Sequence, residues 1–261
     1  MHLVKSLAVA LSMYSKIPVP AVEWKEENMK YAMCFFPVVG VAVGILQYLA
    51  AAVLLGLTDC GAVLFSAVMT LIPVLVTGGI HLDGFADTTD ALASWGSKEK
   101  KLEILKDPHT GAFAVIGLCC WFLFTFALWS EVPGSGNCRN TLAAASCMYV
   151  LSRALSGISV VTFPAAKNSG LLRTFQDSAH KTRVRIVLFL WAALAGTLMC
   201  LLSPVQGAAM LAAAAVIFLY YYRLCKKQFG GTTGDLAGYF LQLCELGMLA
   251  AFVLAGGLLW K

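Results

Sequence analysis

Long apolar runs alternate with short polar segments along the whole chain. The runs of about 18 residues or more, each long enough to cross a bilayer as a helix, cover approximately 32–57, 61–79, 111–130, 141–163, 184–203, 205–222 and 236–260. No internal repeat, linker or second domain interrupts this pattern. It therefore predicts an all-α polytopic membrane bundle with about seven transmembrane helices, in which residues 1–261 form a single membrane-embedded domain.

The residues before the first run predict a helix at the membrane surface. Leu3, Leu7, Leu11 and Tyr14 recur at helical spacing and fall on one face. The same pattern also fits an ordinary amphipathic helix packed against the bundle. No long apolar stretch with a small-residue cleavage site is present here, so a cleaved signal peptide is not expected.

The composition agrees with a membrane protein. Hydrophobic residues make up 59% of the 261 residues, charged residues only 13%, and the mean hydropathy is +0.79. A soluble domain carries about 25% charged residues, so a water-soluble fold is excluded and the lipid bilayer is the expected solvent. None of the nine cysteines forms a C-x-x-C pair, and most lie in apolar runs. We therefore expect neither a zinc site nor disulfides, and nothing indicates a nucleic-acid partner.

The basic residues gather in alternate connections between the predicted helices, on one side of a seven-helix arrangement. They are Lys5, Lys16, Lys25 and Lys30, then Lys98, Lys100, Lys101 and Lys106, then Lys167, Arg173, Lys181, Arg183 and Arg185, and finally Arg223, Lys226 and Lys227. The opposite side receives only Arg139 and Lys261. The positive-inside rule therefore predicts that the N-terminus and the long polar loops are cytoplasmic.

The segment HLDGFADTTDAL directly follows the second apolar run. Asp83, Asp87 and Asp90 stand at i, i+4 and i+7, which places three carboxylates on a narrow arc of one helix. These like charges repel one another unless a cation lies between them. Mg²⁺ takes one or two carboxylates and completes its shell with water and substrate phosphates, so the spacing predicts a metal site.

A simpler explanation exists for the aspartates: Asp83 caps a helix and the other two favour its N-terminal dipole. For His81, three roles are open, namely a proton shuttle, a residue that supports a metal ligand, and a histidine at the membrane interface.

A glycine-rich element opens the last apolar run and predicts a phosphate-binding turn. Backbone N–H groups at such a helix start can bind phosphate. The candidate residues are Gly231, Thr232, Thr233, Gly234 and Asp235. Lys106 and Asp107, from KDPHTGAF, are further candidates for substrate binding, although solvated loop residues would look the same.

Two charged residues lie deep inside predicted helices. Arg153 and Glu245 would be costly to bury without partners. They fit either a structural ion pair or a substrate site in which Arg153 binds a phosphate. Lys167, in the following loop, could attract an anionic substrate or contact lipid headgroups.

The order of HLDGFADTTDAL, KDPHTGAF and GGTTGDLAGYFLQLCEL resembles that of the cobalamin synthase family, also called adenosylcobinamide-GDP ribazoletransferase or cobalamin-5′-phosphate synthase. KIPVP and FFPVVGVAVG also fit the usual beginning of that family, so the resemblance covers essentially the whole chain. It implies an enzyme of vitamin B12 synthesis at the bacterial cytoplasmic membrane. The implied reaction joins adenosylcobinamide-GDP to α-ribazole or its 5′-phosphate and releases GMP with Mg²⁺ as cofactor.

The resemblance also implies site residues. The acidic motif of the family falls on Asp83, Asp87 and Asp90, preceded by His81, and its G-x-T-G-D element falls on the turn that ends in Asp235. We expect Asp83 and Asp87 to be metal ligands, Asp90 to be a ligand or the base, and either a carboxylate or His81 to take the proton of the ribazole hydroxyl. Docking of other cobalamin-assembly enzymes is one reason considered for the membrane location.

Two other classes of protein compete with this interpretation. CDP-alcohol phosphotransferases favour D-G-x-x-A-R, of which this chain has only the D-G, and UbiA-type prenyltransferases need a second aspartate-rich loop that is absent here. A transporter with an ion site at Arg153 and Glu245 would favour two related halves with broken helices, and the sequence contains no such halves.

Overall fold

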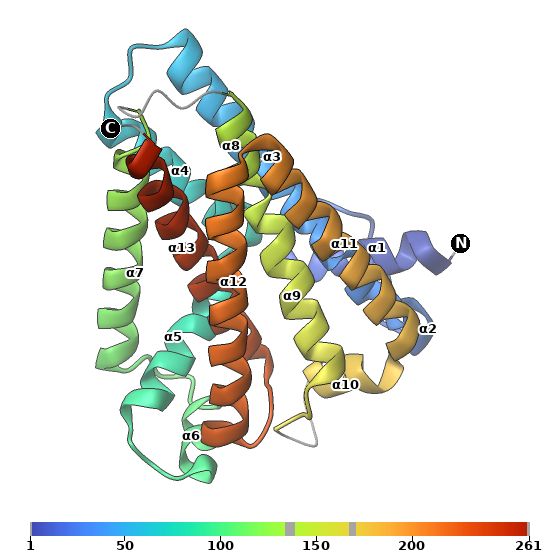
Figure 1. Cartoon of the computed structure of the whole chain (residues 1–261). Coiled ribbons are helices and arrows are strands. Elements are labelled where there is room, and N and C mark those ends of the chain that lie inside the picture. The colour runs from blue at the N-terminus through green and yellow to red at the C-terminus, as the bar shows by residue number, and fades with distance from the viewer. Residues whose placement is uncertain (1, 134–138, 167–170, 260–261) are drawn as a thin grey trace.

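The computed structural model describes residues 2–133, 139–166 and 171–259. Its described residues form helices joined by short connections, and one isolated parallel bridge links Ala165 to Thr232. In chain order the elements are α1 (His2–Tyr14), α2 (Glu26–Met29), η1 (Ala32–Phe35), α3 (Phe36–Leu57), α4 (Ala62–Thr77), α5 (Ile80–Ala93), α6 (Lys98–Ile104), α7 (Ala112–Ser130), α8 (Arg139–Ser146), α9 (Met148–Thr162), α10 (Leu171–Ser178), α11 (Lys181–Leu202), α12 (Pro204–Leu224), η3 (Cys225–Phe229) and α13 (Gly234–Leu259). The predicted all-α membrane bundle is confirmed (Figure 1).

The count of membrane-spanning helices depends on one bend. In the described part of the chain, six helices are long and apolar enough to cross a membrane, and a bent pair formed by α4 and α5 would make a seventh. The predicted second span, 61–79, corresponds to the single helix α4, which is 16 residues long, and the chain bends at its end. Gly78 and Gly79 adopt φ angles of +68° and +77°, a left-handed conformation that favours glycine, and the axes of α4 and α5 meet there at 96°.

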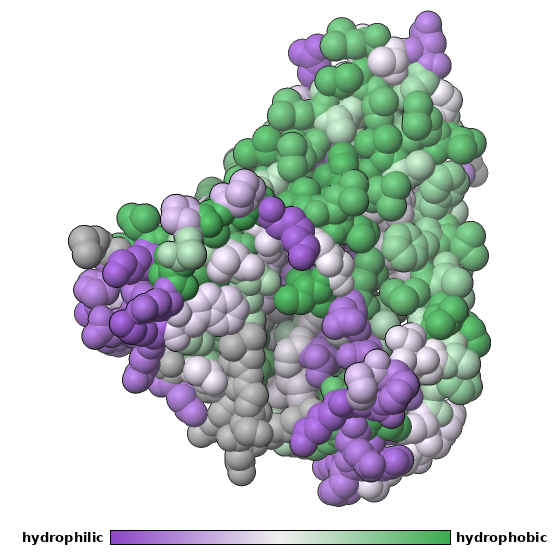
Figure 2. All heavy atoms as spheres, turned by 180° about the vertical axis from the view of Figure 1, so that it is seen from behind, coloured by the Kyte–Doolittle hydropathy of each residue, from purple (hydrophilic) through white to green (hydrophobic). Residues whose placement is uncertain are grey.

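The centre of the bundle consists of α8, α9 and α13. The predicted span 141–163 is divided at Cys147 into α8 and α9, and this pair is the most deeply buried of the candidate spans. Around these helices, α3, α7, α11 and α12 expose many leucine, valine and phenylalanine side chains. Figure 2 shows apolar residues over a continuous part of the surface and polar residues gathered mainly along its lower edge. Such a distribution fits a protein whose sides face lipid.

The N-terminal helix α1 packs against η1, α2 and α3. The face that it buries carries Ser6, Val9 and Ala10, whereas Leu3 is 57% exposed. The expected helix is therefore confirmed, and it is attached to the bundle by small side chains. Of the predicted face, only Leu3 is exposed, whereas Leu7 and Leu11 are partly buried and Tyr14 is directed into the bundle.

Candidate functional site

Two glycines bring α5 and α13 into close contact. A Cβ atom on Gly84 of α5 would lie 2.8 Å from the Cα and the carbonyl oxygen of Asp235 in α13. A Cβ atom on Gly238 of α13 would lie 3.0 Å from the carbonyl oxygen of His81 in α5. Only glycine allows backbones to approach this closely. The contact places the acidic motif of α5 beside the first turn of α13.

The glycine-rich turn before α13 is held in place by the chain after α9. Gly230 has a φ of +75°, and a Cβ atom on Gly231 would lie 2.5 Å from the backbone nitrogen of Ala166. Two backbone hydrogen bonds join the segments, because Ala166 N–H donates to the Thr232 oxygen at 2.9 Å and Thr232 N–H donates to the Pro164 oxygen at 2.8 Å. These contacts fix where α13 begins.

The threonines of this turn have defined partners. The Thr233 hydroxyl accepts a hydrogen bond from the backbone N–H of Leu236 at 3.2 Å, which is the geometry of an N-cap. The Thr232 hydroxyl lies 2.7 Å from the hydroxyl of Tyr221 in α12. Both side chains therefore stabilise the turn, and both also line the pocket described next.

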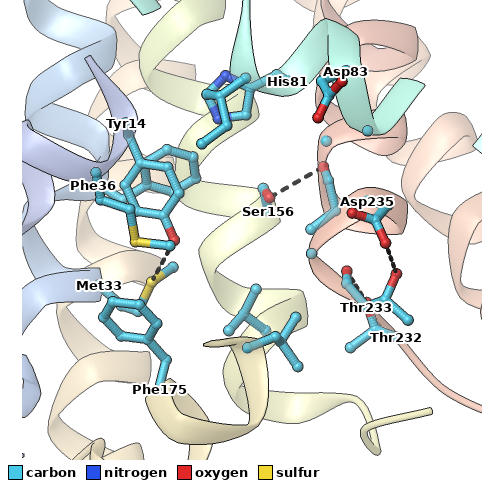
Figure 3. A pocket seen from close by; sticks show the side chains of 18 residues that line it. Tyr14, Met33, Phe36, His81, Asp83, Ser156, Phe175, Thr232, Thr233 and Asp235 are labelled. Atoms are coloured by element: carbon cyan, nitrogen blue, oxygen red, sulfur yellow. Dashed lines mark hydrogen bonds between the residues drawn. The ribbon is translucent and has the colours of Figure 1, made fainter. Parts of the chain in front are cut away.

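A pocket of about 310 Å³ lies between α5, the glycine-rich turn and the N-terminal helices. One side carries polar groups from α5 and from the start of α13, including Asp83, Gly234 and Asp235. The other side is apolar and is formed by Tyr14, Met33, Phe36 and Phe175 (Figure 3). The pocket thus combines an acidic edge with an aromatic wall.

His81 lies between these two sides (Figure 3). It is only 5% exposed, and neither Nδ1 nor Nε2 has a hydrogen-bond partner among the described residues. Its ring stacks at 6.0 Å from the ring of Tyr14 and is tilted at 5.7 Å from that of Phe36. A buried imidazole without partners is unusual.

The structure brings together carboxylates of α5 and α13. Asp83 and Asp235 line the pocket, and Asp87 lies one turn further along α5, outside the lining. Asp87 is partly buried and is repelled by the charges of Asp83, Asp235 and Asp90. In the described part of the chain, no three His, Cys, Asp or Glu side chains are close enough to form a complete metal site.

Asp90, the third aspartate of the predicted metal site, has two backbone partners. Its carboxylate accepts hydrogen bonds from the backbone N–H groups of Gly111 at 2.6 Å and Ala114 at 2.9 Å. Asp90 therefore caps the start of α7, where a negative charge is favourable. Asp90 lies about two turns beyond Asp83 along α5 and does not line the pocket, whereas Asp235 lines it together with Asp83.

Arg153 and Glu245, predicted as substrate-binding residues, instead form a buried ion pair away from the pocket. The Arg153 guanidinium lies 2.6 Å from Glu245 Oε1, and the two side chains are 1% and 5% exposed. Ser152 donates a hydrogen bond to the same oxygen at 2.8 Å. Neither residue lines the large pocket. Of the two alternatives for Arg153 and Glu245, the structure therefore supports the ion pair over the substrate site.

The remaining predicted substrate-binding residues lie elsewhere. Lys106 and Asp107 are exposed and do not line the pocket. A hydrogen bond from the backbone N–H of His109, together with one from its side chain, lowers the pKa of Asp107. Lys167 lies outside the described residues. The structure thus gives Asp107 a local role in the turn before α7.

Sequence reasoning missed the aromatic wall. Tyr14, Met33, Phe36 and Phe175 come from α1, η1, α3 and α10, and each is an ordinary apolar residue in its own segment. No spacing along the chain connects them. Only the packing of these elements against α5 shows that they belong to one pocket.

Comparisons with known proteins agree in the family that they indicate. Residues 6–253 match the model of a family described as cobalamin-5-phosphate synthase. A protein of Lachnoclostridium phytofermentans named adenosylcobinamide-GDP ribazoletransferase is 45% identical over 260 residues, which cover 99% of this chain and 97% of that protein. Proteins with the same name from Clostridium botulinum and Pseudomonas entomophila are each 34% identical, over 94% of this chain and 95% and 97% of theirs. No solved structure matches the chain significantly.

Proposed function

Because the chain belongs to the cobalamin-5-phosphate synthase family, we propose that it is an adenosylcobinamide-GDP ribazoletransferase. It joins adenosylcobinamide-GDP to α-ribazole or α-ribazole 5′-phosphate and releases GMP. The observation that carries this proposal is the meeting of Asp83 and Asp235 with the glycine-rich turn in one pocket. Two segments about 150 residues apart in the chain contribute to it, in agreement with a site that must hold two substrates.

The reaction needs a hydroxyl group to attack phosphorus. A ribazole hydroxyl oxygen forms a new bond to the phosphate that is attached to cobinamide, and the bond from that phosphorus to the bridging oxygen of the diphosphate breaks, so that GMP leaves. The hydroxyl proton goes to a carboxylate that does not hold the metal, for which Asp235 is the candidate because it lines the pocket. The acid predicted earlier for this step, Asp90, already accepts two backbone hydrogen bonds.

The same acidic edge would hold Mg²⁺. Asp83 and Asp87 are the residues that would bind the ion, and their mutual repulsion would be relieved by it. When bound, Mg²⁺ neutralises charge on the diphosphate and on the leaving group. The backbone at Gly234 and the N-terminal end of α13 would orient the phosphates. The protein therefore contributes mainly positioning and charge.

We further propose that the pocket opens to the cytoplasm in the cytoplasmic membrane. The basic connections are the support for this orientation: α6 and the start of α11 carry lysines and arginines, and α6 and α10 lie at the same end of the bundle (Figure 1). Docking of other cobalamin-assembly enzymes on this end stays a prediction.

The test uses the purified protein in detergent with adenosylcobinamide-GDP, α-ribazole and MgCl₂. We expect GMP release and formation of a cobalamin product, and loss of both when EDTA removes the metal. Asp83→Asn should lower kcat at least about 100-fold, because a neutral amide holds the metal much more weakly than a carboxylate does. Asp59→Asn is the matched control, since Asp59 is an exposed acid in the α3–α4 connection.

Either of two results would contradict the proposal. One is a normal Mg²⁺-dependent rate in the Asp83→Asn variant. The other is CMP release from a CDP-alcohol with no reaction of the corrinoid, which would favour a CDP-alcohol phosphotransferase.

A further inference from the structure

The aromatic side of the pocket has no task in the phosphoryl transfer described above. Tyr14 and Phe36 pack with ring centroids 4.3 Å apart, and the hydroxyl of Tyr14 donates to the sulfur of Met33 at 3.7 Å. Phe175 completes this side (Figure 3). Phosphates and ribose gain little from such a surface, whereas a flat heterocycle can stack on it.

His81 supplies an independent observation at the same place. Both of its ring nitrogens are buried without partners among the described residues, and a buried polar group that lacks a partner is costly. The ring lies against Tyr14 and Phe36, at the end of the aromatic wall nearest Asp83. A ligand with a ring nitrogen beside this wall would satisfy the imidazole once the His81 ring turns one of its buried nitrogens into the pocket.

The volume of the pocket restricts the ligand. At about 310 Å³ it lies at the lower end of the range of about 300–1,000 Å³ for small-molecule sites. A nucleoside fits such a space, but a corrin macrocycle with its side chains does not. The corrinoid part of adenosylcobinamide-GDP must therefore lie outside this pocket.

The substrates carry three bases. Adenine belongs to the adenosyl group on the corrinoid, which lies outside the pocket, and the lining distinguishes the other two, guanine and benzimidazole. Guanine presents several donors and acceptors along its edge, which need several polar partners. The polar groups Asp83, Ser156, Thr232, Thr233 and Asp235 also line the pocket, but the wall on which a base would stack is formed by methionine, tyrosine and phenylalanine side chains, with the imidazole of His81 at its end. This composition suits the largely apolar benzimidazole of α-ribazole, which has one free ring nitrogen.

We propose that this pocket binds the acceptor nucleoside, with its benzimidazole base on the wall formed by Tyr14, Phe36 and Phe175 and its free ring nitrogen hydrogen-bonded to His81. The ribose then faces Asp83 and Asp235 on the polar side. This inference rests on the proposed function, because that function supplies the identity of the acceptor. It makes His81 a specificity residue that touches the substrate base.

The experiment uses the purified full-length chain and two variants. His81→Phe keeps a flat apolar ring but removes both nitrogens, and Phe36→Leu removes part of the wall. Phe65→Leu is the matched control, because Phe65 is also a buried aromatic residue but packs against Trp129, outside the pocket. Each protein is checked for folding by its melting temperature in detergent.

Two quantities are measured on each protein. The first is equilibrium binding of α-ribazole, and of free 5,6-dimethylbenzimidazole, without any corrinoid. The second is the pair of KM values for α-ribazole and for adenosylcobinamide-GDP. In both pocket variants we expect α-ribazole binding to weaken about tenfold or more, as for the loss of one buried hydrogen bond or stacking contact. The KM for adenosylcobinamide-GDP should change less than about twofold.

A failure of the proposed function and a failure of this inference give different results. A wild-type protein that binds α-ribazole but releases no GMP would refute the proposed function and leave the pocket assignment standing. Overturning the inference takes one of two results from folded variants: unchanged α-ribazole binding, or an increase in the KM for adenosylcobinamide-GDP instead. A fall in kcat alone for His81→Phe, with normal α-ribazole binding, would likewise overturn it and make His81 a proton-transfer residue.

Discussion

Replacing Glu245 with leucine would leave Arg153 as an unpaired charge in the protein interior. The Arg153 side chain is 1% exposed, its guanidinium lies 2.6 Å from Glu245, and its remaining partners are the backbone oxygen of Tyr149 at 3.0 Å and the hydroxyl of Ser152 at 3.4 Å. Removing one partner of such a pair costs about 3–5 kcal/mol. For a chain of this size, that loss corresponds to a fall in melting temperature of about 6–20 °C.

The double variant Arg153→Met/Glu245→Leu separates structure from substrate binding. Replacing both charges by apolar residues of similar size removes the unpaired charge, and such replacements are often neutral. We therefore expect its melting temperature within about 5 °C of the wild type. Its KM for adenosylcobinamide-GDP should also be unchanged, because neither residue lines the pocket.

The assay is thermal unfolding in detergent, followed by GMP release from the same preparations. A single Arg153→Met variant that melts like the wild type but has a strongly raised KM for adenosylcobinamide-GDP would refute this reasoning. That result would indicate that Arg153 binds a substrate phosphate, which is the alternative that the sequence left open.

Two further predictions concern the elements that build the site. Gly84→Ala should lower both stability and kcat, because its Cβ would lie 2.8 Å from the backbone of Asp235, whereas Gly257→Ala, with nothing within 4 Å, should behave like the wild type in the same melting and GMP-release assays. Asp90→Ala should destabilise the protein by about 0.5–2 kcal/mol through loss of the α7 cap. Asp90→Asn can still accept a hydrogen bond from Gly111 and should retain most of the activity. A loss of turnover in Asp90→Asn as severe as in Asp83→Asn would show that Asp90 belongs to the catalytic site.

The sequence was sufficient for features that depend on local composition. Apolar runs predicted the helices to within a few residues, for example 111–130 against Ala112–Ser130 and 184–203 against Lys181–Leu202. Hydropathy is a property of each segment by itself, so it can be read without knowing the neighbours. The acidic motif, the glycine-rich turn and the family could also be identified from residues that are contiguous in the chain, without knowing their neighbours in the fold.

Tertiary structure decided which of these residues share a site. The spacing of Asp83, Asp87 and Asp90 placed them on one face of a helix, but the start of α7 binds Asp90 and the contact at Gly84 brings Asp235 to the pocket instead. Charge and spacing do not specify which helix end lies opposite a carboxylate.

The bend at Gly78–Gly79 and the aromatic wall were also decided by the fold. A glycine pair inside an apolar run is compatible with a straight helix, and only the left-handed φ angles of the folded chain turn α5 by 96°. Tyr14, Phe36 and Phe175 come from three separate elements. The hydrophobic effect favours burial of each of these side chains, but it is non-directional and does not specify their neighbours. The surface that they form together therefore exists only once α1, α3 and α10 have packed around α5.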